Sequence, residues 1–282
     1  MPGTLYVVAT PIGNLEDVTF RALRILREVS LIAAEDTRRT ARLLQHYSIS
    51  TRTTSLHEHN ERARTPGLIA RLLSGESIAL VSDAGTPVVS DPGRHLVAAA
   101  HESGIRVEPI PGPSAAVAAV SASGLGSGEF AFVGFPPSRA SARQKWLEGL
   151  KAEPRVLVMY EAPHRIHQTL TAMLQVFGDR QVAIGRELTK AHEELVVRPI
   201  SGHLADAPRE IGEYTLVVAP LDPRSAEPIE VPSDHQVAVE FGELTDKVGL
   251  GRREALRELG KKYELTTRQV YGALERVKKS VD

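Results

Sequence analysis

Short apolar runs alternate with segments of helical periodicity along this chain, and this alternation limits the fold more than any other feature. In the first half of the chain we expect strands at residues 5–9, 31–34, 78–81 and 106–110. The run at 78–81 fits a strand covered on both faces, and apolar residues at helical spacing lie between the strands. Strands and helices that alternate in this way predict a parallel sheet covered by helices.

The pattern changes from about residue 130 onward. Further apolar runs lie at residues 130–135, 155–160, 181–185 and 213–219. We interpret this part as a second α/β domain whose strands run in mixed directions. Prolines at positions 220, 223, 228 and 232 then predict a semi-rigid linker, and the sequence after them is helical. We therefore expect an N-terminal α/β domain at 1–117, a C-terminal α/β domain at 118–222, a proline-rich linker at 223–234 and a helical tail at 235–282.

Composition narrows the class of protein. The 282 residues are enough for two domains, and 42% hydrophobic with 24% charged residues is typical of a globular chain. The absence of cysteine excludes a disulfide framework, a cysteine nucleophile and a cysteine zinc site, and it suits a reducing cytosol. No signal peptide or apolar segment of membrane length is visible, so we expect a cytoplasmic protein without a membrane partner. Because the net charge is only -1, contact with nucleic acid requires a local basic patch.

The loop after the run at 78–81 is the most distinctive in the chain. Gly85 permits a positive φ or a close approach of the backbone, and Pro87 stiffens the loop. Asp91 followed by Pro92 predicts a helix N-cap with proline at the first helical position. Loops at the carboxyl ends of strands form the ligand crevice of an open α/β sheet. This loop therefore either lines such a crevice or is an ordinary strand-to-helix turn.

The loops match no phosphate-binding or hydrolase motif. Neither Gly-Lys-Ser/Thr nor Gly-x-Gly-x-x-Gly follows a strand, which weakens a kinase, ATPase or dinucleotide-binding interpretation. No Gly-x-Ser-x-Gly elbow is present, so a serine triad has no support. If the fold brings the loops after 5–9, 78–81 and 106–110 together, they offer backbone donors and acceptors with few charges. Such a lining suits a ligand with an adenine, a ribose and an amino-acid end.

Several polar side chains near strand ends are candidates for chemistry, and each has a structural alternative. Asp36, with Glu35 beside it, could act as a general base, or Asp36 could cap the next helix. Glu187 and Lys190 could accept a proton or orient a hydroxyl, or they could form a structural salt bridge. Tyr160, with the acid that follows it, could hold a ligand or pack a domain interface.

Two further features have weaker signals. His57 and His59 share a face only on a strand, and the zinc-protease pattern His-Glu-x-x-His is absent, which favours a polar loop at the rim of the crevice over a metal site. The segment from Thr245 to Asp282 contains ten lysines and arginines against six acidic residues. These cations could contact phosphates, or they could form a solvated helical face.

Six motifs, taken together in their order and spacing, resemble the tetrapyrrole-methylase superfamily. They lie at residues 10–15 (TPIGNL), 33–38 (AAEDTR), 82–87 with 91–93 (SDAGTP and DPG), 111–113 (PGP), 160–161 with 164–165 (YE and HR) and 186–190 (RELTK). The resemblance extends over nearly the whole chain, the tail included. The superfamily's usual Gly-Asp-Pro is Gly85-Thr86-Pro87 here, and this departure argues against a corrin methylase.

The resemblance implies a fold, a cofactor and a reaction. It implies two α/β domains of tetrapyrrole-methylase type with S-adenosylmethionine bound in the cleft between them, a small C-terminal helical module, no metal, and a homodimer. It implies methyl transfer to the ribose 2'-oxygen of a cytidine in the decoding centre of 16S ribosomal RNA, with the small ribosomal subunit as partner. The alternatives are methylation of a tetrapyrrole or other small molecule, and a non-catalytic nucleic-acid-binding regulator that uses the helical tail.

The resemblance also implies site residues. The methyl donor is expected to contact Pro11, Ala84, Gly85, Thr86, Val89, Ser90, Ser114, Ala115, Tyr160, Glu161 and Leu188. The candidates for a base that assists the ribose hydroxyl are Asp36, Glu187 and, if neutral, Lys190.

Overall fold

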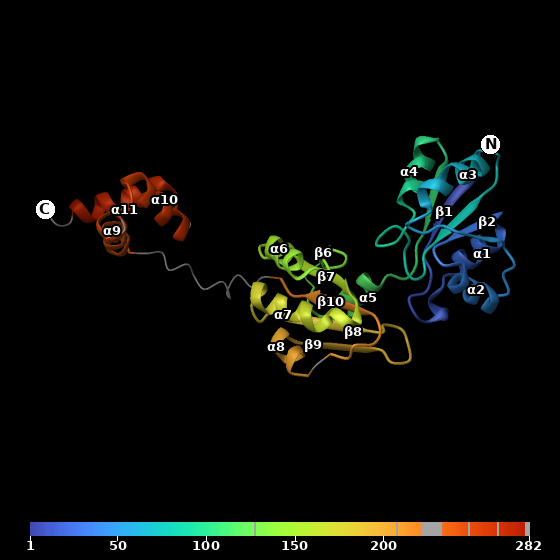
Figure 1. Cartoon of the computed structure of the whole chain (residues 1–282). Coiled ribbons are helices and arrows are strands. Elements are labelled where there is room, and N and C mark those ends of the chain that lie inside the picture. The colour runs from blue at the N-terminus through green and yellow to red at the C-terminus, as the bar shows by residue number, and fades with distance from the viewer. Residues whose placement is uncertain (127, 207, 221–232, 248, 264, 280–282) are drawn as a thin grey trace. The chain divides into compact units, whose positions relative to one another are not determined.

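The N-terminal half of the chain folds into a five-stranded parallel sheet, as the alternating pattern predicts. In the computed structural model its strands lie in the order β3 (Thr53–Ser55), β2 (Leu31–Ala34), β4 (Ile78–Val81), β1 (Thr4–Val8) and β5 (Arg106–Ile110). Figure 1 labels β1 and β2 of this sheet. Every pair of neighbouring strands in this sheet is parallel. The carboxyl ends of the strands therefore lie along one edge, where their loops can form a shared site.

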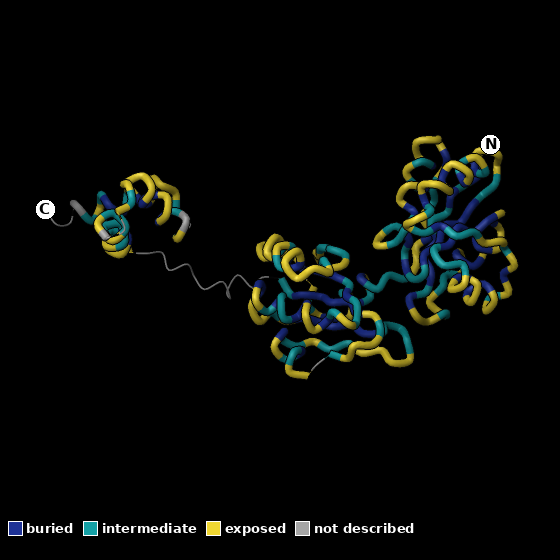
Figure 2. Tube along the Cα trace, in the orientation of Figure 1, coloured by how far each residue is buried: buried dark blue, intermediate teal, exposed yellow. Residues whose placement is uncertain are grey.

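Helices cover both faces of this sheet. They are α1 (Phe20–Glu28), α2 (Thr37–His46), α3 (Glu61–Leu73) and α4 (Arg94–Glu102), with a 3-10 turn η1 (Leu15–Asp17) after β1. Ile32 and Ala34 pack into the core with α1 and α2, whereas Leu31 and Ala33 pack into the core with α3 and α4. Figure 2 shows these strands buried and the outer faces of the helices exposed. Burial on both faces is the reason that the strands read as continuous apolar runs.

The second sheet has mixed strand directions, which confirms that prediction. Its strands lie in the order β6 (Phe130–Phe132), β7 (Val156–Glu161), β10 (Tyr214–Val218), β8 (Gln181–Arg186) and β9 (Glu194–Pro199). β6 is parallel to β7, and the other neighbours are antiparallel. Helix α5 (Ala115–Ser123) packs on one face. The other face carries α6 (Ala140–Leu150), α7 (Ile166–Phe177) with its preceding turn η2 (Pro163–Arg165), and α8 (Ile200–Ala205).

Two edge strands were not predicted from the sequence. β3 is formed by two threonines and a serine, and β9 has only intermediate and exposed positions. Each pairs with a single neighbour in its sheet. Because neither β3 nor β9 has a buried position, both lack the apolar run that identified the other strands.

The structure describes residues 1–126, 128–206, 208–220, 233–247, 249–263 and 265–279, and the chain divides into the units Met1–Pro220 and Leu221–Asp282. Most of the linker predicted at 223–234 lies outside the described residues, and the domain boundaries predicted at 117 and 222 stay predictions. The second unit contains α9 (Asp234–Gly242), a π-helical segment (Glu243–Lys247), α10 (Arg252–Lys262) and α11 (Thr267–Lys279). Its core includes Val237, Leu259 and Val270, so the predicted C-terminal helices are confirmed. In the described part of the chain, no helix has the length and apolarity needed to cross a membrane.

Candidate functional site

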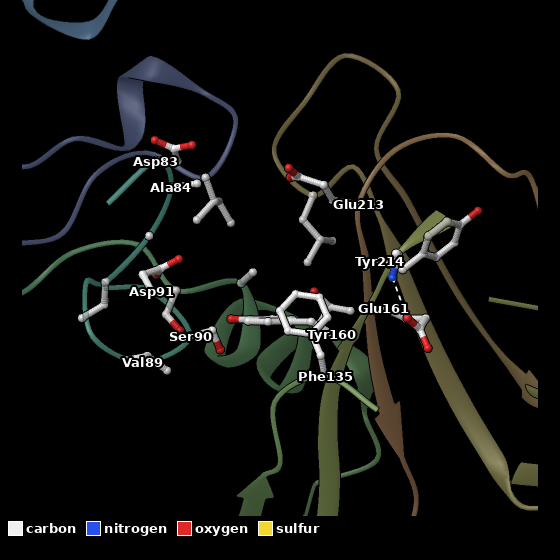
Figure 3. Close-up of a pocket in the computed structure, with 18 of the residues that line it drawn as sticks. Asp83, Ala84, Val89, Ser90, Asp91, Phe135, Tyr160, Glu161, Glu213 and Tyr214 are labelled. Atoms are coloured by element: carbon white, nitrogen blue, oxygen red, sulfur yellow. Dashed lines mark hydrogen bonds between the residues drawn. The ribbon is translucent and has the colours of Figure 1, made fainter. Parts of the chain in front are cut away.

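A cavity of about 410 Å³ lies where loops of the N-terminal sheet meet loops of the second sheet (Figure 3). We call it the inter-sheet cavity. Its walls come from the loops after β1, β2, β4 and β5 on one side, and from the ends of β7, β8 and β10 on the other. Its volume is within the range of about 300–1,000 Å³ that is typical of small-molecule sites.

Backbone hydrogen bonds fasten the loop after β4 across the edge of the sheet. Gly85 has a φ of +79° and exchanges two backbone hydrogen bonds with Thr10, with N···O distances of 2.9 and 3.0 Å. The Thr86 hydroxyl donates to the Pro113 carbonyl at 3.3 Å, which joins the loop after β5. The positive φ expected of Gly85 is confirmed. The three loops therefore form one wall of the cavity.

The end of this loop differs from the prediction. Helix α4 begins after its N-cap residue Gly93, so the prediction that Asp91 caps this helix is wrong. The cap is supplied instead by Glu61 of α3, which is only 5% exposed. Its Oε1 accepts the first backbone N–H groups of α4, from Gly93, His95 and Leu96, at 3.1, 2.7 and 3.3 Å. Asp91 is therefore not needed as a cap, and it lines the inter-sheet cavity.

Glu35, Asp83 and Asp91 form a carboxylate cluster on the cavity wall. Oε2 of Glu35 accepts the backbone N–H of Asp83 at 3.2 Å. Burial, together with the negative charges of Glu35 and Asp83, raises the pKa of Asp91 from 3.8 to about 6. Burial and the charge of Asp83 also raise the pKa of Glu35, against the opposing effect of the backbone hydrogen bond. The prediction that the lining carries few charges is therefore wrong.

An apolar, aromatic surface lies across the cavity from these acids (Figure 3). The ring centroids of Phe135 and Tyr160 are 5.5 Å apart, with the rings tilted by 59°. Phe135 is 53% exposed, and Val89 on the facing loop is 55% exposed. Large apolar side chains that stay this exposed inside a cavity offer a surface for a flat, apolar part of a ligand.

The fold brings most of the predicted donor-binding residues together. Those that line the inter-sheet cavity are Ala84, Gly85, Thr86, Val89, Ser90, Ser114, Ala115, Tyr160, Glu161 and Leu188. Pro11 lines an adjoining cavity instead. The Glu161 carboxylate is buried and bound to Arg165 at 3.1 Å and to Thr169, so it fixes the end of β7. Contact between these residues and a ligand stays a prediction.

The predicted catalytic residues lie outside the lining of the inter-sheet cavity. Asp36 caps α2, since its Oδ1 accepts the Arg38 N–H at 2.8 Å, and hydrogen bonds from the Arg38 side chain and backbone lower the pKa of Asp36. Lys190 forms the salt bridge that the sequence allowed, at 2.8 Å to Glu187, and a second at 2.9 Å to Glu213. Burial opposes the shift, but these two bonds raise the pKa of Lys190, so it is a poor proton acceptor. Their catalytic roles stay predictions.

Sequence reasoning missed several residues of the lining. Glu213 stands at the amino end of β10, and the rule that sites form at the carboxyl ends of parallel strands gives no signal there. Phe135 follows a short strand and was interpreted as part of it. Arg39 lies in the first turn of α2, three residues after the cap, with its guanidinium 3.4 Å from the Asp83 carboxylate. Arg39 could have been found from the sequence. The first turn of a helix that follows a parallel strand lies at the carboxyl edge of the sheet, where the site forms, and Arg39 is in such a turn.

The histidine-containing segment before α3 forms a turn. The backbone N–H of His57 donates to Oδ1 of Asn60 at 2.9 Å. Among the residues that the structure describes, no group of three or more His, Cys, Asp or Glu side chains is placed to hold a metal ion.

The lining fits the chemistry of S-adenosylmethionine. That molecule joins an adenosine to a sulfonium and an ammonium, both cationic, and to one carboxylate. Acidic side chains from both sheets, Asp83 and Asp91 on one side and Glu213 on the other, face the cavity and suit the two cations. The aromatic surface of Phe135 and Tyr160 suits the adenine ring.

Comparison with known proteins agrees with this chemistry. The profile of the tetrapyrrole (corrin/porphyrin) methylases matches residues 4–202. The ribosomal RNA small subunit methyltransferase I of Pseudomonas aeruginosa is 50% identical over 222 residues, which cover 77% of this chain and 79% of that protein. The protein of the same name from Halalkalibacterium halodurans is 45% identical over 271 residues, which cover 95% and 93%.

The solved structure of uroporphyrin-III-C-methyltransferase from Thermus thermophilus is similar in fold. It superposes with a TM-score of 0.56 at 21% identity, over 77% of this chain and 94% of that chain. At this identity the likeness supports the fold alone. The resemblance inferred from the six motifs is confirmed by the profile and the relatives, and the chain belongs to the tetrapyrrole methylase family.

Proposed function

We propose that this chain is an S-adenosylmethionine-dependent methyltransferase that acts on small-subunit ribosomal RNA. The observation that carries the proposal is 50% and 45% identity, over 77% and 95% of the chain, to relatives named for that activity. The acid-lined inter-sheet cavity supports binding of the donor. From the motif resemblance we further infer that the target is the ribose 2'-oxygen of a cytidine in the decoding centre of 16S ribosomal RNA. The same resemblance favours a cytoplasmic homodimer that acts on the small ribosomal subunit.

Positioning is the chain's main contribution to such a reaction. S-adenosylmethionine supplies an electrophilic methyl group on a sulfonium that departs as a neutral thioether. The loop held at Gly85 and the rings of Phe135 and Tyr160 orient the adenosine end, while the carboxylate cluster faces the cationic end. Holding two reactants in line removes a large part of the entropic barrier.

A proton acceptor is the second contribution, because a ribose hydroxyl is a weak nucleophile that loses its proton as the bond forms. We place this acceptor in the carboxylate cluster rather than at Asp36, Glu187 or Lys190. Asp91, with a pKa raised to about 6, is ionised at neutral pH and is a stronger base than an ordinary aspartate. Asp36 is held by Arg38, and Lys190 is held in its charged form.

The two alternative functions fit the cavity less well. A tetrapyrrole substrate carries several carboxylates, and the acids at Glu35, Asp83 and Asp91 would repel them. A non-catalytic regulator that used the C-terminal helices would not need an acid-lined cavity of this volume.

Methyl transfer to defined substrates tests the proposal. Purified protein and radiolabelled S-adenosylmethionine are incubated with small subunits or 16S ribosomal RNA from a strain that lacks the gene, and with a porphyrinoid in parallel. We expect label in the RNA, at one cytidine that resists alkaline cleavage because its 2'-hydroxyl is blocked. Label in the porphyrinoid alone refutes the RNA substrate, and donor binding without transfer to either favours the regulator. Light scattering of the purified protein tests the homodimer.

A further inference from the structure

A second cavity adjoins the inter-sheet cavity. It also has a volume of about 410 Å³, and it lies between the loop after β1, helix α2 and the loop after β8. We call it the α2 cavity. The residues that line both cavities are Ile12, Arg39, Asp83, Ala84 and Glu213. The two cavities therefore meet at a common wall.

One face of α2 supplies positive charge to this second cavity. Arg39 and Arg42 are three residues apart on the helix, so their side chains project from the same side. Both residues are exposed and both line the cavity. Arg39 has one contact with a carboxylate, at 3.4 Å from Asp83. Within the described part of the chain, Arg42 has no hydrogen-bond or ion-pair partner.

The other cations near this cavity are already neutralised. Lys190 is held between Glu187 and Glu213 at 2.8 and 2.9 Å. Its side chain also packs closely against the backbone of Gly13, where an added Cβ would lie 2.5 Å from the Lys190 Cγ. Arg38 pairs with Asp36 at 2.8 Å. The uncompensated positive charge of the α2 cavity is therefore at Arg42.

We propose that the α2 cavity binds the RNA backbone beside the methylated nucleotide, with Arg42 as the principal phosphodiester contact and Arg39 as its neighbour. This inference rests on the proposed function, and it assigns the substrate side of that site. A guanidinium presents parallel N–H donors that match two phosphate oxygens. A ribose attached to that phosphate then lies at the common wall, where Asp83 faces the inter-sheet cavity.

Charge separates the two reactants in this arrangement. The cationic donor meets the carboxylate cluster, and the anionic RNA meets the arginines of α2. A phosphodiester placed in the inter-sheet cavity would face three carboxylates at Glu35, Asp83 and Asp91 instead. The distribution of charge therefore favours RNA in the α2 cavity and the donor in the inter-sheet cavity.

Substitution of Arg42 tests this inference on the full-length protein. The variants are Arg42→Ala, Arg42→Lys and the matched control Arg21→Ala, since Arg21 is an exposed arginine on α1 that lines neither cavity. Unmethylated small subunits and radiolabelled donor give KM and kcat, and calorimetry gives the affinity for S-adenosylhomocysteine. We expect Arg42→Ala to raise the KM for subunits roughly ten- to a hundredfold, as expected for loss of a charged hydrogen bond. Arg42→Lys should have an intermediate KM, because lysine keeps the positive charge but lacks the paired N–H donors of the guanidinium.

Salt dependence distinguishes a phosphate contact from a structural role. Loss of one phosphate contact should lower the slope of log affinity against log salt by about 0.7–0.9, while S-adenosylhomocysteine affinity stays at the wild-type value. Wild-type KM and salt slope in Arg42→Ala, with active wild-type enzyme, would overturn the inference and leave the proposed function intact. Equal effects in Arg21→Ala, or a parallel loss of S-adenosylhomocysteine affinity, would also overturn it. A wild-type protein that methylates no ribosomal RNA overturns the proposed function, and the inference with it.

Discussion

Glu61 links the stability of the N-terminal sheet to the shape of the inter-sheet cavity. Glu61→Ala removes the carboxylate oxygen that accepts three backbone N–H groups at the start of α4, at 3.1, 2.7 and 3.3 Å. Because Glu61 is only 5% exposed, water has little access to replace it. Loss of an ordinary N-cap costs about 0.5–2 kcal/mol, and a buried hydrogen bond to a charged group contributes about 1.5–3 kcal/mol. Since the three bonds share one oxygen, we expect Glu61→Ala to lower the free energy of unfolding by about 3–4 kcal/mol.

Two further variants calibrate this value. Glu61→Gln keeps the shape and an acceptor oxygen but loses the charge, so we expect a loss of about 1–2 kcal/mol. Glu58 is an exposed glutamate in the turn just before α3, and Glu58→Ala should stay within about 0.5 kcal/mol of the wild type.

Denaturant unfolding measures these differences, with an unchanged m-value as the sign that the change is in stability alone. Donor affinity should fall from Glu58→Ala through Glu61→Gln to Glu61→Ala. The reason is that Asp91, which lines the inter-sheet cavity, lies two residues before Gly93, whose N–H donates to Glu61. A Glu61→Ala variant that is less than about 1 kcal/mol destabilised, or equal to Glu61→Gln, would refute the reasoning. Solvent would then be capping α4.

Three other outcomes are expected. Gly85→Val should weaken donor binding more than Gly85→Ala. Both variants must adopt a φ of +79°, which costs about 1–2 kcal/mol, but only valine adds γ-carbons beside the cavity. Equal donor affinities of the two variants by calorimetry would remove Gly85 from the site. Asp91→Asn should become more stable relative to the wild type as the pH rises from 3.8 through about 6. A carboxyl whose pKa is raised by folding contributes stability below its unfolded pKa and loses it as the pH passes its folded pKa, so a pH-independent difference in unfolding free energy contradicts the shift. A chain that ends at residue 232 should keep its donor affinity and lose affinity for ribosomal RNA, with a shallower slope of log affinity against log salt. The oligomeric state is measured alongside. Unchanged RNA affinity and salt slope would show that the C-terminal helices do not contact RNA.

The sheets were predictable where both faces of a strand are buried. Leu31 and Ala33 meet one layer of helices, and Ile32 and Ala34 meet the other, so the local sequence alone carries the signal. The strands β3 and β9 were not predictable in this way. They depend on pairing with β2 and β8, which the local sequence does not show.

The loops of the site were predictable from motifs, whereas the roles of single acids were not. The Asp-Pro-Gly sequence at 91–93 has the local pattern of a helix cap. The residue that caps the helix, Glu61, lies 32 positions before Gly93 in the chain, in a segment whose sequence suggested only a polar rim. A distant carboxylate therefore changed the role of Asp91 from helix cap to cavity wall, and no local rule contains that information.

Net charge was uninformative for a related reason. A value of -1 averages over surfaces of opposite sign, and only the pairing of individual side chains reveals them. On α2, Asp36 neutralises Arg38, while Arg42 has no partner among the described residues. Across the common wall, burial and the negative charges of Glu35 and Asp83 instead raise the pKa of Asp91, and the same negative charges favour a bound cation. Opposite charges kept apart in adjoining cavities allow one site to bind a cationic donor and an anionic substrate at the same time, which a uniformly basic RNA-binding surface would not.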